Sequence, residues 1–379
     1  MEFVRRADHR RLLGVQSRDR RLMQNLAIIG CGRVASARYV EVCRDELRDA
    51  RVIVACDRVP SRADELARAL ACDSEYDYDD VLRRNDVDVV MILTESGHHY
   101  RHACSALQAG KHVIVEKPPG MLPSQVLDCV ELAAKRERMY APILQNRLNP
   151  AMLALKEAFD EGRFGRQVLA TIRLRWCRFQ EYYEDGWHGT WQMDGGVINQ
   201  QAFHHLDALQ WIAGPVSEVV CAQANALNQL EAEDTTVAAL RFEDGSLGTI
   251  EATTAIRPED VEASISIAGE GGMVVIGGIA LNEIQTWSFV VPRPEDATTP
   301  ERASQVVPTG YGLSHGPLIQ EVVDRLEQGE LKPPISGHDA IPAIRLVHAL
   351  YRSEEEGGWV SLDDHPLSAR IDRAAGGAT

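Results

Sequence analysis

Residues 26–35 read LAIIGCGRVA, and this stretch determines how the chain begins to fold. The apolar run 26–29 predicts a buried strand, and the spacing of apolar residues further on predicts a helix. Between them Gly30 permits a tight turn, Gly32 lets the backbone approach a pyrophosphate, and Ala35 is small where the helix meets the strand. A strand, a glycine turn and a helix in this order are the context that a dinucleotide-binding loop requires.

The residues around the glycines complete the predicted cofactor site. Arg33 and Val34 open the helix whose amides and dipole face the phosphates. Asp57 ends the second predicted strand, where a carboxylate hydrogen-bonds an adenosine ribose and repels a 2′-phosphate. The sequence therefore favours NAD. Arg58, directly after it, can soften that choice, so NADP stays an alternative.

Five apolar runs alternate with helical patterns from residue 25 to residue 146. The predicted strands are 26–30, 51–57, 87–94, 111–118 and 140–145. Ser61 and Ser124 are predicted to cap two of the helices, with Asp64 placed for a capping box. Strands that alternate with helices predict an α/β fold with a doubly wound parallel sheet.

Beyond Asn149 the pattern changes to strands with alternating polarity. Val168, Ala170, Ile172 and Leu174 are predicted to point to one side of a half-buried antiparallel strand. Hairpins are predicted at 235–255 and 262–278, and helices at 198–214, 317–329 and 340–353. We therefore expect a second, α+β domain at 147–379, with the ligand site between the two domains.

Residues 111–120 read KHVIVEKPPG, and their apolar strand ends on a lysine. A lysine at a strand end is usually solvated. Here two prolines stiffen the backbone after Lys117, and the strand end faces the predicted nicotinamide side. An ammonium held there can bind a sugar hydroxyl, stabilise an alkoxide or relay a proton. We predict that Lys117 is catalytic.

A second candidate lies in GGVINQQAFHHLD, residues 195–207. On a continuous helix Gln200, His204 and Asp207 share one face, at spacings i, i+4 and i+7. A histidine between an amide and a carboxylate suits an oriented acid or base, whereas His205 is expected to be structural. The residues alone leave open whether His204 or Lys117 is the base.

Composition narrows the partners and the compartment. The net charge of −16 argues against nucleic acid or an anionic membrane as a partner. The eight cysteines are scattered and lack metal spacing, which predicts a reducing, cytoplasmic location with no disulfides and no metal. The Arg-rich residues 1–24 are expected to be a disordered extension, or to reflect a true start at Met23.

Taken together, GCGRVA, the EKP motif and the downstream HxxD helix resemble the Gfo/Idh/MocA family of oxidoreductases. The resemblance implies a Rossmann domain, an open antiparallel sheet in the second domain that forms dimers or tetramers, and hydride transfer at a carbinol carbon. It also implies that Lys117 and His204 are catalytic. Thr94 and His99 match positions near the nicotinamide, and Glu116 belongs to the cofactor-side EKP motif.

The second domain resembles UDP-N-acetyl-glucosaminuronate 3-dehydrogenases more closely, in LQNRLNPAM (144–152), WCRFQEYYEDGWHGTWQMDGG (176–196) and residues 231–254. These enzymes oxidise a sugar 3-hydroxyl ahead of an aminotransferase. The resemblance implies that the sugar-nucleotide pocket is lined by Gln145, Arg147, Arg178, Trp187, Trp191, Gln200 and His204. Arginines suit phosphate or carboxylate and aromatics suit sugar and base, although the aromatic cluster can also serve packing alone.

The chain departs from the family at Gln200, where the family usually has Asp or Asn. Glutamine can accept a hydrogen bond but cannot take a proton, so a catalytic role of this residue is in question. Ala202, Glu95 and His98 also replace the usual glycine, proline and leucine, which leaves the exact sugar open. Two alternatives remain: an NADPH-dependent ketosugar reductase, and a non-catalytic NAD-binding regulator. Retention of both predicted catalytic residues favours an enzyme.

Overall fold

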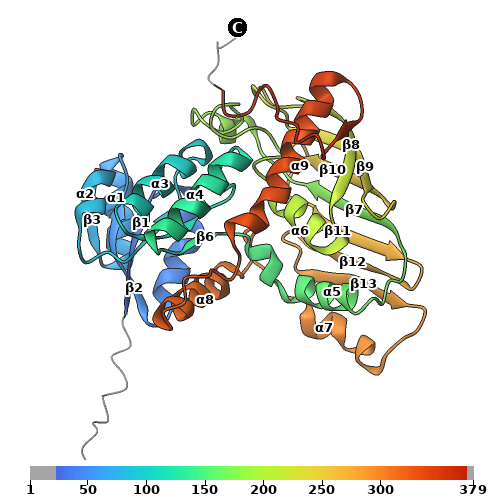
Figure 1. The fold of residues 1–379 in the computed structure, drawn as a ribbon, viewed down its shortest axis with the longest axis horizontal. Helices are drawn as coiled ribbons and strands as arrows, with labels where there is room; N and C mark the ends of the chain where they lie inside the picture. The colour runs from blue at the N-terminus through green and yellow to red at the C-terminus, as the bar shows by residue number, and fades with distance from the viewer. Residues whose placement is uncertain (1–22, 374–379) are drawn as a thin grey trace, which may run out of the picture.

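The computed structural model describes residues 23–373, and Figure 1 shows two sheets with helices packed around them. The predicted N-terminal extension therefore lies outside the described residues, apart from Met23 and Gln24. Gln24 is already the first residue of a strand, so the sheet begins one residue earlier than the predicted domain boundary.

The first sheet, sheet A, has six parallel strands in the order β3-β2-β1-β4-β5-β6. They are β1 (Gln24–Ile29), β2 (Ala50–Cys56), β3 (Asp73–Glu75), β4 (Val89–Ile92), β5 (His112–Val115) and β6 (Tyr140–Pro142). The chain winds outward from β1 in one direction through β3 and then in the other direction through β6. Ligands bind beyond the carboxyl ends of the strands where the winding reverses, so the loops after β1, β4 and β5 meet at one edge. The predicted doubly wound parallel sheet is confirmed.

The helices around sheet A differ from the predictions mainly where they begin. They are η1 (Ala35–Tyr39), η2 (Val42–Glu46), α1 (Pro60–Leu70), α2 (Tyr78–Arg83), η3 (Ser96–His98), α3 (His99–Gln108) and α4 (Pro123–Arg136). The predicted caps at Ser61 and Ser124 are wrong, because α1 and α4 begin one residue earlier, at Pro60 and Pro123. Proline suits the first helical position, since it has no amide hydrogen to leave unpaired. Asp64 forms no capping box and accepts a hydrogen bond from a tyrosine hydroxyl instead.

Sequence periodicity missed β3 and α2. Strand β3 has three residues, DSE, without an apolar run, and α2 has six residues. Elements this short present too few positions for a period to be recognised.

The second sheet, sheet B, has eight strands in the order β13-β12-β11-β7-β10-β9-β8-β14. They are β7 (Gln167–Arg175), β8 (Val216–Ala224), β9 (Thr235–Phe242), β10 (Leu247–Thr253), β11 (Glu262–Gly269), β12 (Gly272–Gly277), β13 (Glu283–Phe289) and β14 (Val360–Ser361). The two predicted hairpins, β9–β10 and β11–β12, are confirmed. The sheet is mostly antiparallel, but β7 runs parallel to β10. Alternation along β7 identifies its buried face and not its neighbour, so this pairing could not be predicted.

Within β7 the predicted facing of Val168 is wrong. Ala170, Ile172 and Leu174 are buried as expected, whereas Val168 is 53% exposed. The register between β7 and β11 shifts at Ala268, opposite the start of the strand. An extra residue at such a bulge reverses the facing of the residues before it.

Three long helices cover one face of sheet B, as Figure 1 shows: α5 (Pro150–Asp160), α6 (Phe203–Ala213) and α9 (Gly337–Glu356). The remaining helical segments are η4 (Gln145–Leu148), η5 (Gln180–Tyr183), η6 (Pro294–Ala297), α7 (Thr299–Ala303) and α8 (His315–Glu327). Late in the chain α8 returns to sheet A, where Gln320 Oε1 accepts a hydrogen bond of 2.7 Å from Arg48 N. The two halves of the chain are therefore interleaved, and a boundary at residue 146 stays a prediction.

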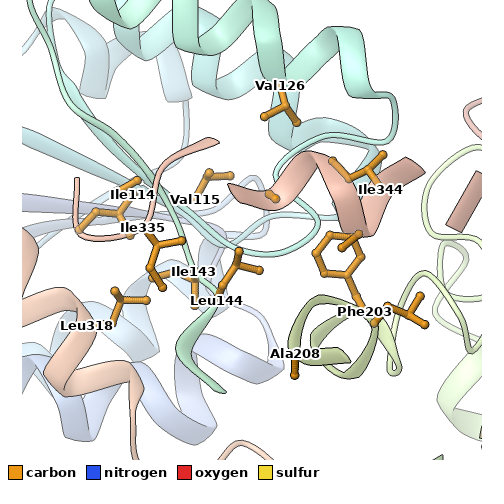
Figure 2. Close-up of a cluster of buried hydrophobic side chains, with 14 of the residues drawn as sticks. Ile114, Val115, Val126, Ile143, Leu144, Phe203, Ala208, Leu318, Ile335 and Ile344 are labelled. Atoms are coloured by element: carbon orange, nitrogen blue, oxygen red, sulfur yellow. The ribbon is translucent and has the colours of Figure 1, made fainter. Parts of the chain in front are cut away.

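One hydrophobic cluster joins the two halves (Figure 2). Ile114 and Val115 of β5 extend into it from sheet A, and Phe203 of α6 and Ile344 of α9 extend into it from the other side. All four are buried to at least 99%. This packing fixes the end of β5 relative to the start of α6.

Alanine substitutions at Gly30 and Gly32 should have different effects on the free energy of unfolding. A Cβ on Gly30 would lie 2.7 Å from backbone atoms of Leu93 and Thr94, and its φ is +92°, whereas a Cβ on Gly32 meets no described atom within 4 Å. We expect Gly30→Ala to lower the free energy of unfolding by about 2–4 kcal/mol. Gly32→Ala should change it by less than about 0.5 kcal/mol. Urea unfolding of both variants tests this, and equal losses would contradict the packing seen at Gly30.

Candidate active site

The glycine loop after β1 is closed by Asp57. Oδ2 of Asp57 accepts a hydrogen bond from Cys31 N at 2.9 Å, and Oδ1 accepts one from Val59 N at 2.8 Å. The carboxylate thus ties the loop after β1 to the loop after β2. The free space beside Gly32 fits the close approach of a pyrophosphate to the backbone. A carboxylate oxygen can accept more than one hydrogen bond, so Asp57 can still accept one from a ribose hydroxyl.

Two basic residues near this loop have partners. Arg58, whose side chain is 79% exposed, pairs with Glu95 at 3.0 Å. Arg33 lies 4.6 Å from the ring centre of Tyr182 and 3.9 Å from Asp185 Oδ2. Arg33 therefore links the glycine loop to a segment that follows β7. Val34, also predicted at the cofactor, is partly buried against the core.

His99 connects the ends of β4 and β5. Its Nε2 lies 2.9 Å from Thr94 O and its Nδ1 lies 2.7 Å from Pro118 O, and the side chain is 1% exposed. Burial lowers the pKa of His99. His99 thus links the loop after β4 to the loop after β5. Thr94 Oγ1 contacts His102 Nδ1 at 3.0 Å.

Glu116 is a buried carboxylate with three partners. Its Oε1 accepts a hydrogen bond from the Tyr39 hydroxyl at 2.7 Å and lies 3.6 Å from His315 Nε2. Its Oε2 accepts one from Lys117 N at 3.0 Å. Burial by itself raises the pKa of Glu116, but His315, Lys117 and Tyr39 stabilise the anion and bring the pKa down to about 2. Glu116 is therefore a permanent anion at the end of β5.

Lys117 points from the end of β5 to the segment before α6. Its Nζ donates hydrogen bonds to Gln200 O at 2.7 Å and to Gln200 Oε1 at 2.6 Å. Burial lowers the pKa of Lys117, and the positive charge of Arg178 lowers it further, against the opposing effect of Glu116 and Asp194. The lysine is therefore held in place and is easier to deprotonate than an exposed one.

The predicted helical face of Gln200, His204 and Asp207 is not formed, because α6 begins only at Phe203. Gln200 lies in the turn before the helix and binds Lys117. Gln145 Nε2 lies 3.3 Å from His204 Nε2, and His204 Nδ1 is buried without a hydrogen-bond partner among the described residues. Burial, with the charge of Lys117 added, holds the pKa of His204 well below its usual range, so the ring is neutral at pH 7.

Asp207 is bound by Arg147 instead of orienting His204. Arg147 Nε donates to Asp207 Oδ2 at 2.8 Å, and its Nη2 donates to Oδ1 at 2.6 Å. The same guanidinium donates to Asp339 O at 3.0 Å and lies over Trp211. Because its donors are engaged in this way, Arg147 holds η4 in position. We therefore do not assign Arg147 to the substrate pocket.

Arg178 differs from Arg147 in keeping free donors. Nη1 of Arg178 binds Cys177 O at 2.6 Å and Asp260 Oδ1 at 2.8 Å. Its Nε and Nη2 have no hydrogen-bond partner among the described residues. A guanidinium with two free donors can bind a phosphate or a carboxylate.

The two tryptophans predicted to line the pocket, Trp187 and Trp191, also differ in their surroundings. Trp187 is partly exposed and stacks on His188, with ring centres 3.6 Å apart. Trp191 packs edge-on against Tyr351 of α9 at 5.0 Å and lies under Arg370. Trp191 thus takes part in packing, whereas Trp187 remains a candidate for ligand contact.

Sequence reasoning missed Asp194, a carboxylate 1% exposed in the loop before Gly195. Its Oδ2 accepts a hydrogen bond from Gly189 N at 2.9 Å, and its Oδ1 is buried without a hydrogen-bond partner among the described residues. The available signal was a carboxylate directly before a glycine pair. In residues 23–373 no group of three His, Cys, Asp or Glu side chains could hold a metal.

Comparison with known proteins agrees with this geometry. The family model "Oxidoreductase family, NAD-binding Rossmann fold" matches residues 24–143, and "Oxidoreductase family, C-terminal alpha/beta domain" matches residues 156–362. Both models describe Gfo/Idh/MocA proteins. Inositol 2-dehydrogenase of Rhizobium meliloti is 23% identical over 88% of this chain and 98% of its own length.

Two solved structures are more similar in sequence. The WlbA dehydrogenase of Chromobacterium violaceum, in complex with NADH and UDP-GlcNAcA, is 32% identical with a TM-score of 0.82, and the match covers 90% of this chain and 96% of that one. The WlbA dehydrogenase of Bordetella pertussis, with the same ligands, is 32% identical with a TM-score of 0.83, over 89% and 97% of the two chains. With both family models matched and the glycine loop and the EKP lysine meeting at one sheet edge, the chain belongs to the Gfo/Idh/MocA family of NAD-dependent oxidoreductases.

Proposed function

We propose that this protein oxidises a secondary hydroxyl of a UDP-linked sugar acid, with NAD as the hydride acceptor. The 3-hydroxyl of UDP-GlcNAcA or of a close relative is the preferred substrate. The observation that carries the proposal is Lys117, anchored by Gln200 at the edge of sheet A where the glycine loop also lies. The two relatives at 32% identity, which bind NADH and UDP-GlcNAcA, support the choice of sugar.

The chemistry divides between Lys117 and His204. When it is deprotonated, Lys117 takes the hydroxyl proton as the carbinol carbon becomes a carbonyl. Burial holds the pKa of His204 well below its usual range, and we assign His204 the role of a neutral hydrogen-bonding group. Bound NAD supplies the acceptor for the hydride that leaves the carbon.

Binding of the substrate's charged groups falls to Arg178. Its two free guanidinium donors suit the diphosphate or the carboxylate of a UDP-sugar acid. Trp187, partly exposed on the same loop system, offers a ring face to sugar or base. Gln145 and Gln200 complete the lining by orienting His204 and Lys117.

We also propose a cytoplasmic homodimer or homotetramer that associates through sheet B. The helices cover one face of this sheet (Figure 1), and its strands carry several exposed apolar side chains: Leu169, Val237, Leu247 and Met273, each at least 40% exposed. An uncovered face with apolar side chains is typical of an association surface. Among the described residues no helix has the length and apolar character to cross a membrane.

The first test of the function uses UDP-GlcNAcA, NAD and two lysine variants. We expect NAD reduction at 340 nm with the wild-type enzyme and a loss of about 10³-fold in kcat for Lys117→Ala, because a positioned base contributes that order of rate. Lys135→Ala, which changes an exposed lysine of α4, is the control and should retain full activity. If no UDP-sugar reduces NAD and NADPH reduces a ketosugar, the reductase alternative is favoured.

Gly32→Ala separates cofactor binding from stability. Since its Cβ would enter the space that we assign to the pyrophosphate, we expect the Kd for NADH to rise at least about tenfold in the folded variant. Nucleotide fluorescence titration measures this. An unchanged Kd would place the cofactor elsewhere.

The choice of nucleotide should depend on Asp57. Asp57→Ala removes the charge that repels a 2′-phosphate, so we expect the preference for NAD over NADP to fall about 10-fold to 100-fold. Because Asp57 also holds the glycine loop, affinities for both nucleotides are to be compared as a ratio. A ratio that stays constant would exclude this role.

A further inference from the structure

The turn before α6, residues 196–202, is held by a hydrogen-bonded pair of side chains from two other parts of the chain. Glu233 lies in the segment before β9 and is 4% exposed, and Tyr351 of α9 is fully buried. The Tyr351 hydroxyl donates a hydrogen bond of 3.2 Å to Glu233 Oε1. The chemistry proposed above gives neither residue a role.

This pair binds three consecutive backbone amides at the start of the turn. Gly196 N donates a hydrogen bond of 2.9 Å to the Tyr351 hydroxyl. Val197 N donates one of 2.9 Å to Glu233 O, and Ile198 N donates one of 3.0 Å to Glu233 Oε1. A buried amide without a partner is costly, so the turn depends on the pair for its conformation.

The glycines at 195 and 196 allow the backbone to approach the pair closely. A Cβ on Gly196 would lie 2.2 Å from both Glu233 O and Glu233 Oε2. A Cβ on Gly195 would lie 3.0 Å from the Tyr351 hydroxyl, and the φ of this residue is +74°. The glycine pair that precedes α6 in the sequence is therefore required by contact with Glu233 and Tyr351.

The same turn carries the hydrogen-bond acceptors of Lys117. Gln200 N donates a hydrogen bond of 2.9 Å to Gly196 O, so Gln200 is bound to the residue that Tyr351 holds. Lys117 Nζ donates to Gln200 O at 2.7 Å and to Gln200 Oε1 at 2.6 Å. Direct hydrogen bonds thus connect the pair to the turn, and the turn to the lysine.

We propose that Glu233 and Tyr351 are positioning residues for Lys117, because they fix the turn that presents Gln200 to its ammonium group. The inference rests on the proposed function for the catalytic role of Lys117. Charge-assisted hydrogen bonds to Gln200 favour the protonated lysine. If the turn is no longer fixed, these bonds weaken, the pKa of Lys117 falls, and Nζ is held less well against the substrate hydroxyl.

The first test requires no substrate. The chain has five lysines, Lys111, Lys117, Lys135, Lys156 and Lys332, so ¹³Cε-labelled lysine gives few NMR signals, and Lys117→Ala identifies the one of interest. In Tyr351→Phe, which deletes only the hydroxyl, we expect the pKa of Lys117 to fall by at least about half a unit. An unchanged Lys117 titration overturns the proposal, whatever the enzyme's substrate is.

Ser353→Ala is the matched control from the same helix. Ser353 is also fully buried, and its hydroxyl accepts a hydrogen bond from Cys221 N at 3.0 Å and donates one to Gly358 O at 2.7 Å. This variant therefore loses a similar hydroxyl of α9 that does not hold the turn. We expect an unchanged Lys117 titration even where Tm falls as much as in Tyr351→Phe. Equal pKa shifts in the two variants would show a loss of stability alone and overturn the proposal.

Two variants of Glu233 separate the reach of its side chain from its charge. Glu233→Gln keeps an oxygen for the Ile198 N–H and loses the charge, whereas Glu233→Asp keeps the charge on a shorter side chain. We expect the pKa of Lys117 to fall by at least about half a unit in Glu233→Asp and to change by less than about 0.3 units in Glu233→Gln. The reverse order would contradict positioning. If Tyr351→Phe does not fold, this pair of variants decides.

Kinetics relate the position of Lys117 to activity. With UDP-GlcNAcA and NAD we expect kcat of Tyr351→Phe to fall at least about tenfold while KM changes less than about threefold, because a misplaced base mainly slows the chemical step. Ser353→Ala should keep the wild-type kcat. A shifted Lys117 titration with an unchanged kcat would overturn the link between position and rate. If the wild-type protein oxidises no UDP-sugar, the proposed function fails, and the Lys117 titrations still decide the positioning.

Discussion

A shared apolar cluster holds β5 of sheet A against α6 and α9, the helices that cover sheet B. Val115 and Phe203 are both fully buried in it to within 1%. Lys117 lies two residues beyond Val115, and His204 is the residue after Phe203. Because packed interiors hardly deform, this cluster sets how far apart the two candidate catalytic side chains lie. The polar contact of Lys117 with Gln200 follows from apolar packing several residues away.

Two buried carboxylates, Glu116 and Asp194, have pKa values shifted in opposite directions. Glu116 has a tyrosine hydroxyl, a histidine and a backbone amide as partners, and its pKa is lowered to about 2. Asp194 has a single backbone amide at its carboxylate, and burial raises its pKa to about 8. The number of partners therefore decides which carboxylate is a fixed charge and which can exchange protons.

Local sequence features predicted most of the fold. Apolar runs identified five of the six parallel strands, and the two glycine-centred hairpins of sheet B were read correctly. The errors concern information that is not local: the parallel pairing of β7 with β10, and the capture of Asp207 by Arg147 from 60 positions away. Gln200 was misplaced because a helical spacing does not reveal where the helix begins. Asp194 went unnoticed because it lies in a loop without periodicity, where the sequence does not reveal which side chains are buried.

The segment that follows β7 couples the two halves chemically. Asp185 of this segment lies 3.9 Å from Arg33 in the glycine loop, and Met193 accepts a hydrogen bond from Gly97 after β4. Asp194 is the next residue, so it lies on the same loop. A displacement of this loop would change both the environment of Arg33 and the charge beside Lys117. The surroundings of Arg33 and the charge that raises the pKa of Lys117 therefore depend on one structural element.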